Sequence, residues 1–243
     1  YIGSLIAIDL LNHNINPIII DNCSTSKIKT LDRLKKITNH DINFYKCDLC
    51  NFFDLKNTLE DIEFDGVVHL AGYKSIQESM YNPTKYYFNN LNSASNILKI
   101  VKEKNVNLFI FSSSATVYGE PSKLPLTENH SLNPINVYGK TKLVIENMLK
   151  DICSNDEKFK AVCLRYFNPL GSYKRGLIGE DPAITSDNLV SQICNVIFEK
   201  QSYLNIYGSK LNTFDGSAVR DFIHISDLTY GHISALNWMK DNQ

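Results

Sequence analysis

Three side chains near the middle of the chain have the types and the spacing needed to move a proton on and off a hydroxyl group. Tyr138 and Lys142 are four residues apart, so in a helix they share one face. A free tyrosine, with a pKa of about 10, is a poor base at neutral pH, but an ammonium one turn away favours the phenolate. The hydroxyl of Ser114 could hydrogen-bond the same substrate oxygen. The three groups would exchange a proton with an alcohol or sugar while a cofactor takes a hydride.

Two elements must position these groups. The apolar run Phe109-Ile110-Phe111 ends in three serines, which predicts a buried parallel strand over 106–112 with hydroxyls at its carboxyl end, where open α/β sheets bind ligands. Tyr138 lies in a helix predicted over 134–154, with Asn133 as N-cap and Pro134 in the first turn. The strand and the helix would bring the three groups together.

Strand-like and helix-like segments alternate along the whole first part of the chain. We predict strands over 17–22, 42–49, 64–70 and 161–166, and helices over 3–14, 51–61 and 83–104. This rhythm indicates an α/β fold with a doubly wound parallel sheet of the Rossmann type and right-handed crossovers. We assign residues 1–169 to this domain. His69, within the fourth strand, is expected to be a core histidine with its hydrogen bonds satisfied.

Residues 170–243 are predicted to be part of a second, smaller α/β domain. After a loop over 171–187, we expect a helix over 188–200 and strands over 204–208 and 219–225. Ser226 and Asp227 would cap a last helix that ends near Met239. Residues 221–240 are expected to pack back on the first domain.

Composition excludes several classes of partner. The net charge of -1 provides no basic field for nucleic acid or an anionic membrane, and no apolar run approaches the roughly 20 residues of a membrane span. No signal peptide opens the sequence. Six scattered cysteines suit reduced thiols and a cytoplasmic protein. Cys47-x-x-Cys50 lacks a second ligand pair at matching spacing, so we expect no metal site.

Two stretches, Phe-Ser-Ser-Ser-Ala-Thr-Val-Tyr-Gly (111–119) and Leu-Arg-Tyr-Phe-Asn-Pro (164–169), resemble the extended short-chain dehydrogenase/reductase family, and within it the UDP-glucose 4-epimerases. The resemblance implies bound NAD and a UDP-hexose substrate. Tyr138 would take the proton of the sugar 4-hydroxyl, Ser114 would bridge the hydrogen bond, and Lys142 would hold the ribose. A transient 4-keto sugar would turn over and be reduced on its other face, which interconverts UDP-galactose and UDP-glucose.

An acidic residue supports the choice of cofactor. Asp21 ends the second strand of the family's pattern, about 20 residues after the expected glycine turn, where a carboxylate binds the ribose diol of NAD and repels the 2'-phosphate of NADP. The resemblance implies cofactor contacts from these residues: Gly3, Asp21, Asn22, Asp48, Leu49, Leu70, Ala71, Gly72, Lys74, Asn90, Ser112, Tyr138, Lys142, Tyr166 and Phe167.

Substrate contacts follow from the same resemblance. They are implied for Ser114, Tyr138, Asn168, Asn188, Leu189, Asn205, Tyr207 and Arg220. Arg220 would bind the diphosphate, since a guanidinium forms paired hydrogen bonds to such groups. A salt bridge from Arg220 to Asp221 is the alternative.

Other functions remain open. A nucleotide-sugar dehydratase would carry Asp-Glu after the catalytic hydroxyl, whereas Ala115 and Thr116 follow Ser114 here. A UDP-pentose or UDP-N-acetylhexosamine 4-epimerase, or a non-catalytic nucleotide-binding relative, is not distinguished. The resemblance also implies a homodimer formed through helices 83–104 and 134–154. We expect the family's first strand and glycine turn before Tyr1 and more of the substrate domain after Gln243, so that this segment alone would be inactive.

Overall fold

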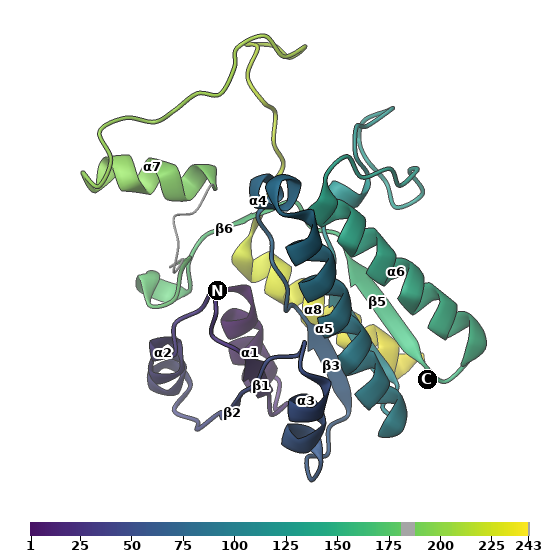
Figure 1. Cartoon of the computed structure of the whole chain (residues 1–243). Helices are drawn as coiled ribbons and strands as arrows, with labels where there is room; N and C mark the ends of the chain where they lie inside the picture. Colours follow the sequence, from purple (N-terminus) through teal and green to yellow (C-terminus); the bar gives the residue numbers. More distant parts are fainter. Residues whose placement is uncertain (181–187, 243) are drawn as a thin grey trace.

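The computed structural model describes residues 1–180 and 188–242. The elements, shown in Figure 1, are α1 (Ile2–Asn12), β1 (Ile18–Asp21), α2 (Lys29–Thr38), β2 (Asn43–Lys46), α3 (Phe52–Leu59), β3 (Gly66–His69), α4 (Ile76–Tyr81), α5 (Pro83–Glu103), β4 (Leu108–Ser112), η1 (Ala115–Val117), α6 (Val137–Asn155), β5 (Lys160–Leu164), β6 (Asn168–Leu170), η2 (Lys174–Gly176), α7 (Leu189–Ile197), β7 (Phe222–His224) and α8 (Ile225–Asp241).

All strand pairs are parallel, which confirms the predicted α/β class. β3, β4 and β5 form one sheet, while β1 pairs with β2 and β6 pairs with β7. β1 and β3 belong to separate sheets, because within the described residues no strand hydrogen-bonds to both of them. The carboxyl ends of β1, β2, β3 and β4 nevertheless carry the residues expected at the cofactor.

Helices cover both faces of the three-stranded sheet, as Figure 1 shows. All five residues of β4 are buried, and its side chains alternate between the faces. Phe109 and Phe111 pack in a cluster with side chains of α3, α5 and α6, whereas Leu108 and Ile110 pack against α8. α8 also contacts α1 and β5. The strand that ends at the serines is therefore fixed from both sides.

The helix that carries Tyr138 and Lys142 begins three residues later than the predicted 134. Asn136, with an extended backbone, is the N-cap, and its side-chain oxygen accepts a hydrogen bond of 2.7 Å from the Gly139 amide. The expectation of Asn133 as cap is wrong. Pro134 is buried ahead of the helix, and a Cβ added at Gly139 would lie 2.9 Å from its Cβ. Pro134 therefore packs against the first turn from outside.

The part of the chain after β6 differs most from expectation. Residues 204–208 form no strand: Figure 1 shows the segment between α7 and β7 leading away from the sheet, and Tyr207 is 90% exposed. A strand needs a neighbour to hydrogen-bond, and none lies beside this segment in the described chain. α8 begins at Ile225 and is capped by His224, whose ring accepts from the Ser226 amide at 3.3 Å, so Ser226 is not the cap.

Two α-helices of the described residues, α2 and α4, were not predicted. α2 places Leu31, Leu34 and Ile37 on one face against the core, and of these only Leu34 is buried. α4 is a short helix whose N-cap, Ser75, accepts from the Glu78 amide at 3.2 Å. Of the predicted loop 171–187, the structure describes η2 and an antiparallel bridge between Tyr173 and Ile178; residues 181–187 lie outside the described residues.

Some general features of the described residues bear on function. No helix there combines the length and apolarity needed to cross a membrane, and no group of three His, Cys, Asp or Glu side chains there could hold a metal ion. The six cysteines are free thiols.

We expect Gly119→Ala to destabilise the fold. Gly119 has a φ of +69°, and a Cβ there would press on the carbonyl oxygen of Asn133. Backbone cannot yield as a flexible side chain does, so the loss in unfolding free energy should be roughly 2 kcal/mol. Chemical denaturation measures it. The control is Gly231→Ala in α8, where nothing lies within 4 Å of the added atom. Equal midpoints for both variants would contradict this account of Gly119.

Candidate active site

Ser114 stands directly beyond β4 and caps η1. Its hydroxyl oxygen accepts hydrogen bonds from the amide and the hydroxyl of Thr116, at 3.2 and 3.0 Å. With its acceptor positions occupied, the hydroxyl proton is left to donate, and a hydrogen bond from Ser114 to Tyr138 favours the phenolate. The Ser114 and Tyr138 side chains are thus close enough to interact, and their joint action on a substrate oxygen stays a prediction.

Tyr138 is positioned from two sides. Its backbone amide donates to the Ser79 hydroxyl of α4 at 3.2 Å, and its ring lies in the turn that starts α6. Burial raises the pKa of Tyr138, and the hydrogen bond from Ser114 opposes this shift. The expectation of a lowered pKa is therefore wrong here: the Lys142 ammonium lies 5.7 Å from the ring centroid and does not offset the desolvation of the phenolate.

Lys142 lies under the end of β4. Its ammonium donates to the Ser112 carbonyl oxygen at 2.7 Å and sits 4.6 Å from the centroid of the Phe111 ring. Burial lowers the pKa of Lys142 to about 8, and the charge of Glu146 acts in the opposite direction. The side chain is therefore still largely an ammonium at neutral pH. It ties α6 to the end of the strand that precedes Ser114.

His69 is not the satisfied core histidine that we expected. Its ring is 3% exposed and stacks on Phe111, with centroids 5.9 Å apart, and its Nε2 has no hydrogen-bond partner. Burial, and then the charge of Lys142, lower the pKa of His69 to about 3. The ring is therefore neutral, and it adds no second cation beside Lys142.

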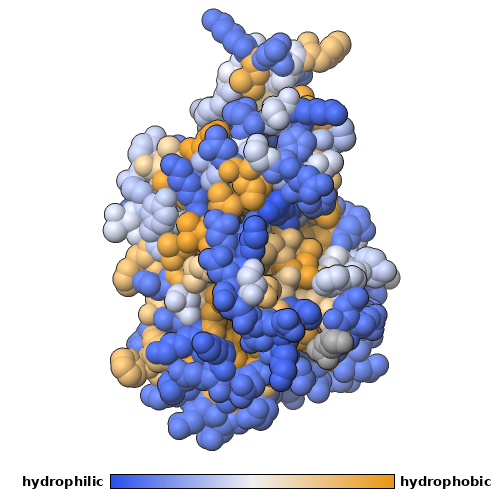
Figure 2. All heavy atoms as spheres, turned by 90° about the vertical axis from the view of Figure 1, so that its right-hand side faces the viewer, coloured by the Kyte–Doolittle hydropathy of each residue, from blue (hydrophilic) through white to orange (hydrophobic). Residues whose placement is uncertain are grey.

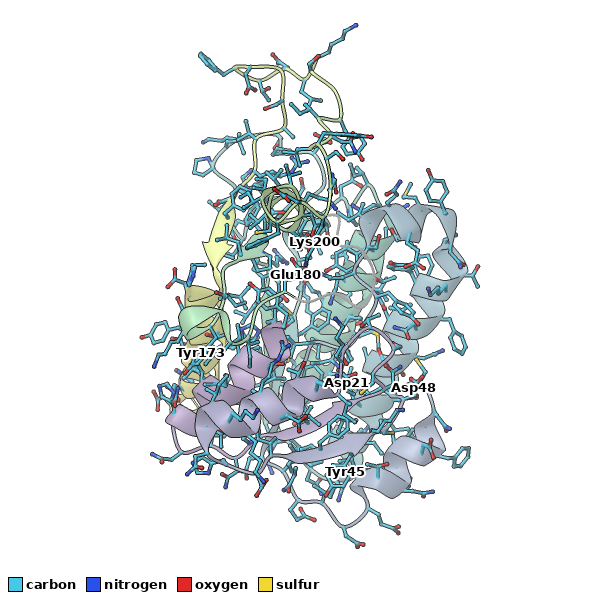
Figure 3. The ribbon with its side chains drawn as sticks, turned by 90° about the vertical axis from the view of Figure 1, so that its left-hand side faces the viewer. Asp21, Tyr45, Asp48, Tyr173, Glu180 and Lys200 are labelled. Atoms are coloured by element: carbon cyan, nitrogen blue, oxygen red, sulfur yellow. The ribbon has the colours of Figure 1, made fainter. Side chains whose placement is uncertain are left out.

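The two predicted acids of the nucleotide end lie together. Asp21 ends β1 and Asp48 follows β2, and Figure 3 shows them at one level of this parallel pair. Asn22 donates to Asp48 at 3.2 Å. One oxygen of Asp21 accepts from the Cys23 amide and the Ser26 hydroxyl, at 2.6 and 3.0 Å. These bonds fix the direction in which the carboxylates point.

Gly72 and Asn90 build a narrow turn after β3. Gly72 has a φ of +148°, and a Cβ there would lie 3.0 Å from the Asn90 side-chain oxygen. The Asn90 side chain accepts from the Tyr73 amide at 2.8 Å and donates to the Tyr73 carbonyl and the Thr141 hydroxyl. Asn90 therefore holds the turn against α6, and the contact with a phosphate that the sequence analysis expected of it stays a prediction.

The remaining residues expected at the cofactor have contacts of several kinds with other parts of the chain. A Cβ added at Gly3 would lie 4.0 Å from the side chain of Leu70. The Lys74 ammonium forms an ion pair with Glu180 at 3.0 Å. The Ser112 hydroxyl contacts His232 at 3.0 Å, away from Lys142. Leu49 packs on the core, Ala71 and Phe167 are exposed, and Tyr166 is largely buried with a pKa raised by burial and by Tyr138.

The predicted substrate residues beyond β5 are not gathered around Tyr138. Asn168 donates to the Asp221 carbonyl at 2.8 Å, and Asn188 donates to Glu180 at 2.6 Å. Leu189 is half exposed. Asn205, Tyr207 and Arg220 are exposed on the segment that leads away from the sheet, and Arg220 donates to the Val219 carbonyl.

Comparison with known proteins decides the family. All 243 residues match the NAD dependent epimerase/dehydratase family. The chain belongs to this family. It is 42% identical to the UDP-glucose 4-epimerase of Dictyostelium discoideum over 237 residues, which cover 98% of the chain and 69% of that protein. The corresponding enzyme of Bacillus subtilis is 40% identical, with 97% and 70% covered.

A solved structure agrees. The UDP-glucose 4-epimerase of Bifidobacterium longum, crystallised with NAD+ and UDP, superposes with a TM-score of 0.94 at 38% identity, covering 98% of this chain and 71% of that one. The predicted Rossmann-type fold is thereby confirmed.

One buried group of this epimerase/dehydratase escaped the sequence analysis. Glu146 on α6 accepts from Ser113 and forms an ion pair with Arg165, which also reaches the Tyr118 hydroxyl at 3.3 Å. The sequence showed Glu146 only as a single acidic residue, four positions after Lys142 and among apolar residues of the predicted helix. Such an acid is indistinguishable from a solvated one until the position of Arg165 is known.

Proposed function

We propose that the protein is a UDP-glucose 4-epimerase that interconverts UDP-galactose and UDP-glucose with bound NAD. The observation that carries the proposal is the position of Tyr138 and the buried Lys142 on α6 at the carboxyl end of β4, where the Lys142 ammonium lies 5.7 Å from the centroid of the Tyr138 ring and donates to the Ser112 carbonyl. The similarity to UDP-glucose 4-epimerases over nearly the whole chain supports it.

The residues present fit NAD. Asp21 and Asp48 offer carboxylates to hydroxyl and amino groups, and Gly72, with a φ of +148°, lets the backbone turn sharply after β3 against the Asn90 side chain. Lys74 would neutralise a phosphate, with Gly3 and Leu70 beside it. Asn22, Leu49, Ala71, Asn90, Ser112, Tyr166 and Phe167 remain proposals as cofactor residues. Bound NAD supplies a nicotinamide that takes a hydride from the sugar C4 and returns it.

The chain's own residues handle the proton. Tyr138, as phenolate, takes the proton of the sugar 4-hydroxyl and later gives it back, while the Ser114 hydroxyl donates to the same oxygen. Because burial favours the neutral phenol, Tyr138 needs a cation nearby to act as a base, and Lys142 is the buried cation within reach. Asn168, Asn188, Leu189, Asn205, Tyr207 and Arg220 are proposed to hold the UDP-sugar.

We expect Asp21→Ala to weaken NADH binding by roughly tenfold, because a charged acceptor for the ribose is lost, and to leave NADPH binding equal or tighter. Titration of protein fluorescence with each nucleotide measures both constants. Asp21→Asn is the control for the turn, since an amide oxygen can still accept from Cys23 and Ser26. It should relax the NADH preference without loosening the turn. An unchanged preference in both variants would contradict the role of Asp21.

The test of the function is direct. The purified protein should release NAD on denaturation and convert UDP-galactose to UDP-glucose. UDP-xylose and UDP-N-acetylglucosamine, offered separately, decide between hexose, pentose and N-acetylhexosamine preference. A protein that binds NAD but converts none of these would be a non-catalytic relative, and the proposal would fail.

We also propose a homodimer in the cytoplasm. α4 and α5 expose Met80, Tyr81 and Phe88, and α6 exposes Val144. Figure 2, which views the side of the molecule bearing α6, shows apolar side chains exposed between polar ones. Such surface suits a second copy. The free thiols suit a reducing compartment. Light scattering and cell fractionation test the two proposals.

A further inference from the structure

A buried polar group links three elements of the active site. The Ser113 hydroxyl donates to Glu146 at 2.5 Å, and Arg165 donates to both oxygens of the same carboxylate, at 2.6 to 3.2 Å. Ser113 is fully buried, and Glu146 is 7% exposed. Arg165 also lies over the Tyr118 ring, with 5.1 Å from its central carbon to the centroid. The carboxylate therefore has hydrogen-bond donors on both oxygens and is largely shielded from solvent.

Each partner is adjacent to a residue of the proposed chemistry. Ser113 precedes Ser114, Arg165 precedes Tyr166, and Glu146 lies one helical turn after Lys142. The Tyr166 carbonyl in turn accepts from the Ala115 amide at 3.1 Å. The carboxylate of Glu146 thus connects β4, β5 and α6 at the points where they deliver Ser114, Tyr166 and Lys142.

The same carboxylate affects the charge of Lys142. The groups around that ammonium are the Ser112 carbonyl and Phe111 from β4, the neutral His69 from β3, and Tyr138 and Glu146 from α6. Of these, Glu146 is the only one that carries an anionic charge at neutral pH, and it favours the protonated amine against the effect of burial.

Resting on the proposed function, we propose that Glu146 is a positioning residue for epimerisation: through Ser113 it orients the turn that presents Ser114, and through its charge it keeps Lys142 protonated. Stabilisation of the fold does not by itself explain the Glu146–Arg165 ion pair, because buried ion pairs can often be replaced by apolar residues without loss of stability.

The test uses Glu146→Gln, Glu146→Asp and Ser113→Ala, with Asp151→Asn as control, because Asp151 is an exposed acid on the same helix. The first readout is the titration of the Lys142 amine by NMR of 15N-lysine-labelled protein, with Lys142→Arg to assign the signal. The second is kcat for UDP-galactose against pH. The titration needs no substrate, so it judges Glu146 even if the protein proves not to epimerise UDP-galactose.

Glu146→Gln should move the Lys142 titration to lower pH by about one unit, and the alkaline limb of kcat should move with it. Glu146→Asp keeps the negative charge, but its shorter side chain no longer reaches the Ser113 hydroxyl. We therefore expect kcat to fall while the titration of the Lys142 amine stays at the wild-type pH. Ser113→Ala should lower kcat roughly tenfold with an unchanged KM. Asp151→Asn should leave both readouts as in the wild type.

An unmoved Lys142 titration in Glu146→Gln, or wild-type kcat in Ser113→Ala, would overturn the proposal. Glu146→Gln leaves Arg165 without its counter-charge and could fail to fold. In that case the double variant Glu146→Gln, Arg165→Met, which leaves neither charge buried alone, takes its place in the titration with the same expected shift.

Discussion

Tyr138→Phe should lower kcat for UDP-galactose about a thousandfold, the usual contribution of a positioned general acid and base. Phenylalanine keeps the ring and its packing but cannot exchange a proton, and Ser114 alone has no basic partner. NAD should remain bound, since none of the proposed nucleotide contacts at Asp21, Asp48 or Gly72 is touched. Steady-state kinetics and the NAD released on denaturation measure the two effects.

The matched control for this variant is Tyr230→Phe, which removes a hydroxyl from a tyrosine 66% exposed on α8. It should behave as the wild type. If Tyr138→Phe kept more than about a third of the wild-type turnover, the contribution of the phenol would lie far below that of a general acid and base, and the assignment of Tyr138 would be wrong.

Lys142→Met should cost turnover about a hundredfold. Without the ammonium, the buried phenolate loses the nearby positive charge, and the pKa of Tyr138, already raised by burial, should rise further. The fold should survive, because methionine can pack on Phe111 and removing a buried amine removes its desolvation cost. Kinetics over a range of pH, together with thermal denaturation, separate the loss of function from a loss of structure.

Lys140→Met is the control, because Lys140 is exposed two residues earlier on the same helix. It should retain normal turnover. If Lys142→Met unfolded at a much lower temperature than Lys140→Met, the ammonium would be mainly structural, and its bond to the Ser112 carbonyl would be its principal role.

The sequence was sufficient for the α/β fold and for the grouping of Ser114, Tyr138 and Lys142. Both follow from strong local patterns: an apolar strand that stops at three hydroxyls, and a helix with two polar residues at a spacing of four. The start of α6 was missed because Asn133 and Asn136 are equally good caps. Only the packing of Pro134 against Gly139 decides between them.

Electrostatics could not be predicted from spacing. Tyr138 and Lys142 share a helix face, yet the pKa of Tyr138 is raised, because burial outweighs a charge that lies beyond hydrogen-bond distance. The Glu146 pair with Arg165 was missed for a similar reason: it joins α6 to the end of β5 through space. The predicted strand 204–208 failed because apolar alternation makes a strand only where a partner lies alongside.

The unpartnered His69 ring affects how the protein responds to acid. Because its pKa in the folded protein is about 3, below the value near 6.5 of an unfolded chain, the unfolded chain binds more protons at intermediate pH. Mild acidification therefore favours unfolding, and the loss of stability grows as the pH falls below about 6.5, the ordinary pKa of histidine. Buried His232, whose pKa is also lowered by burial, acts in the same direction. Storage buffers on the neutral side should keep this protein folded longest.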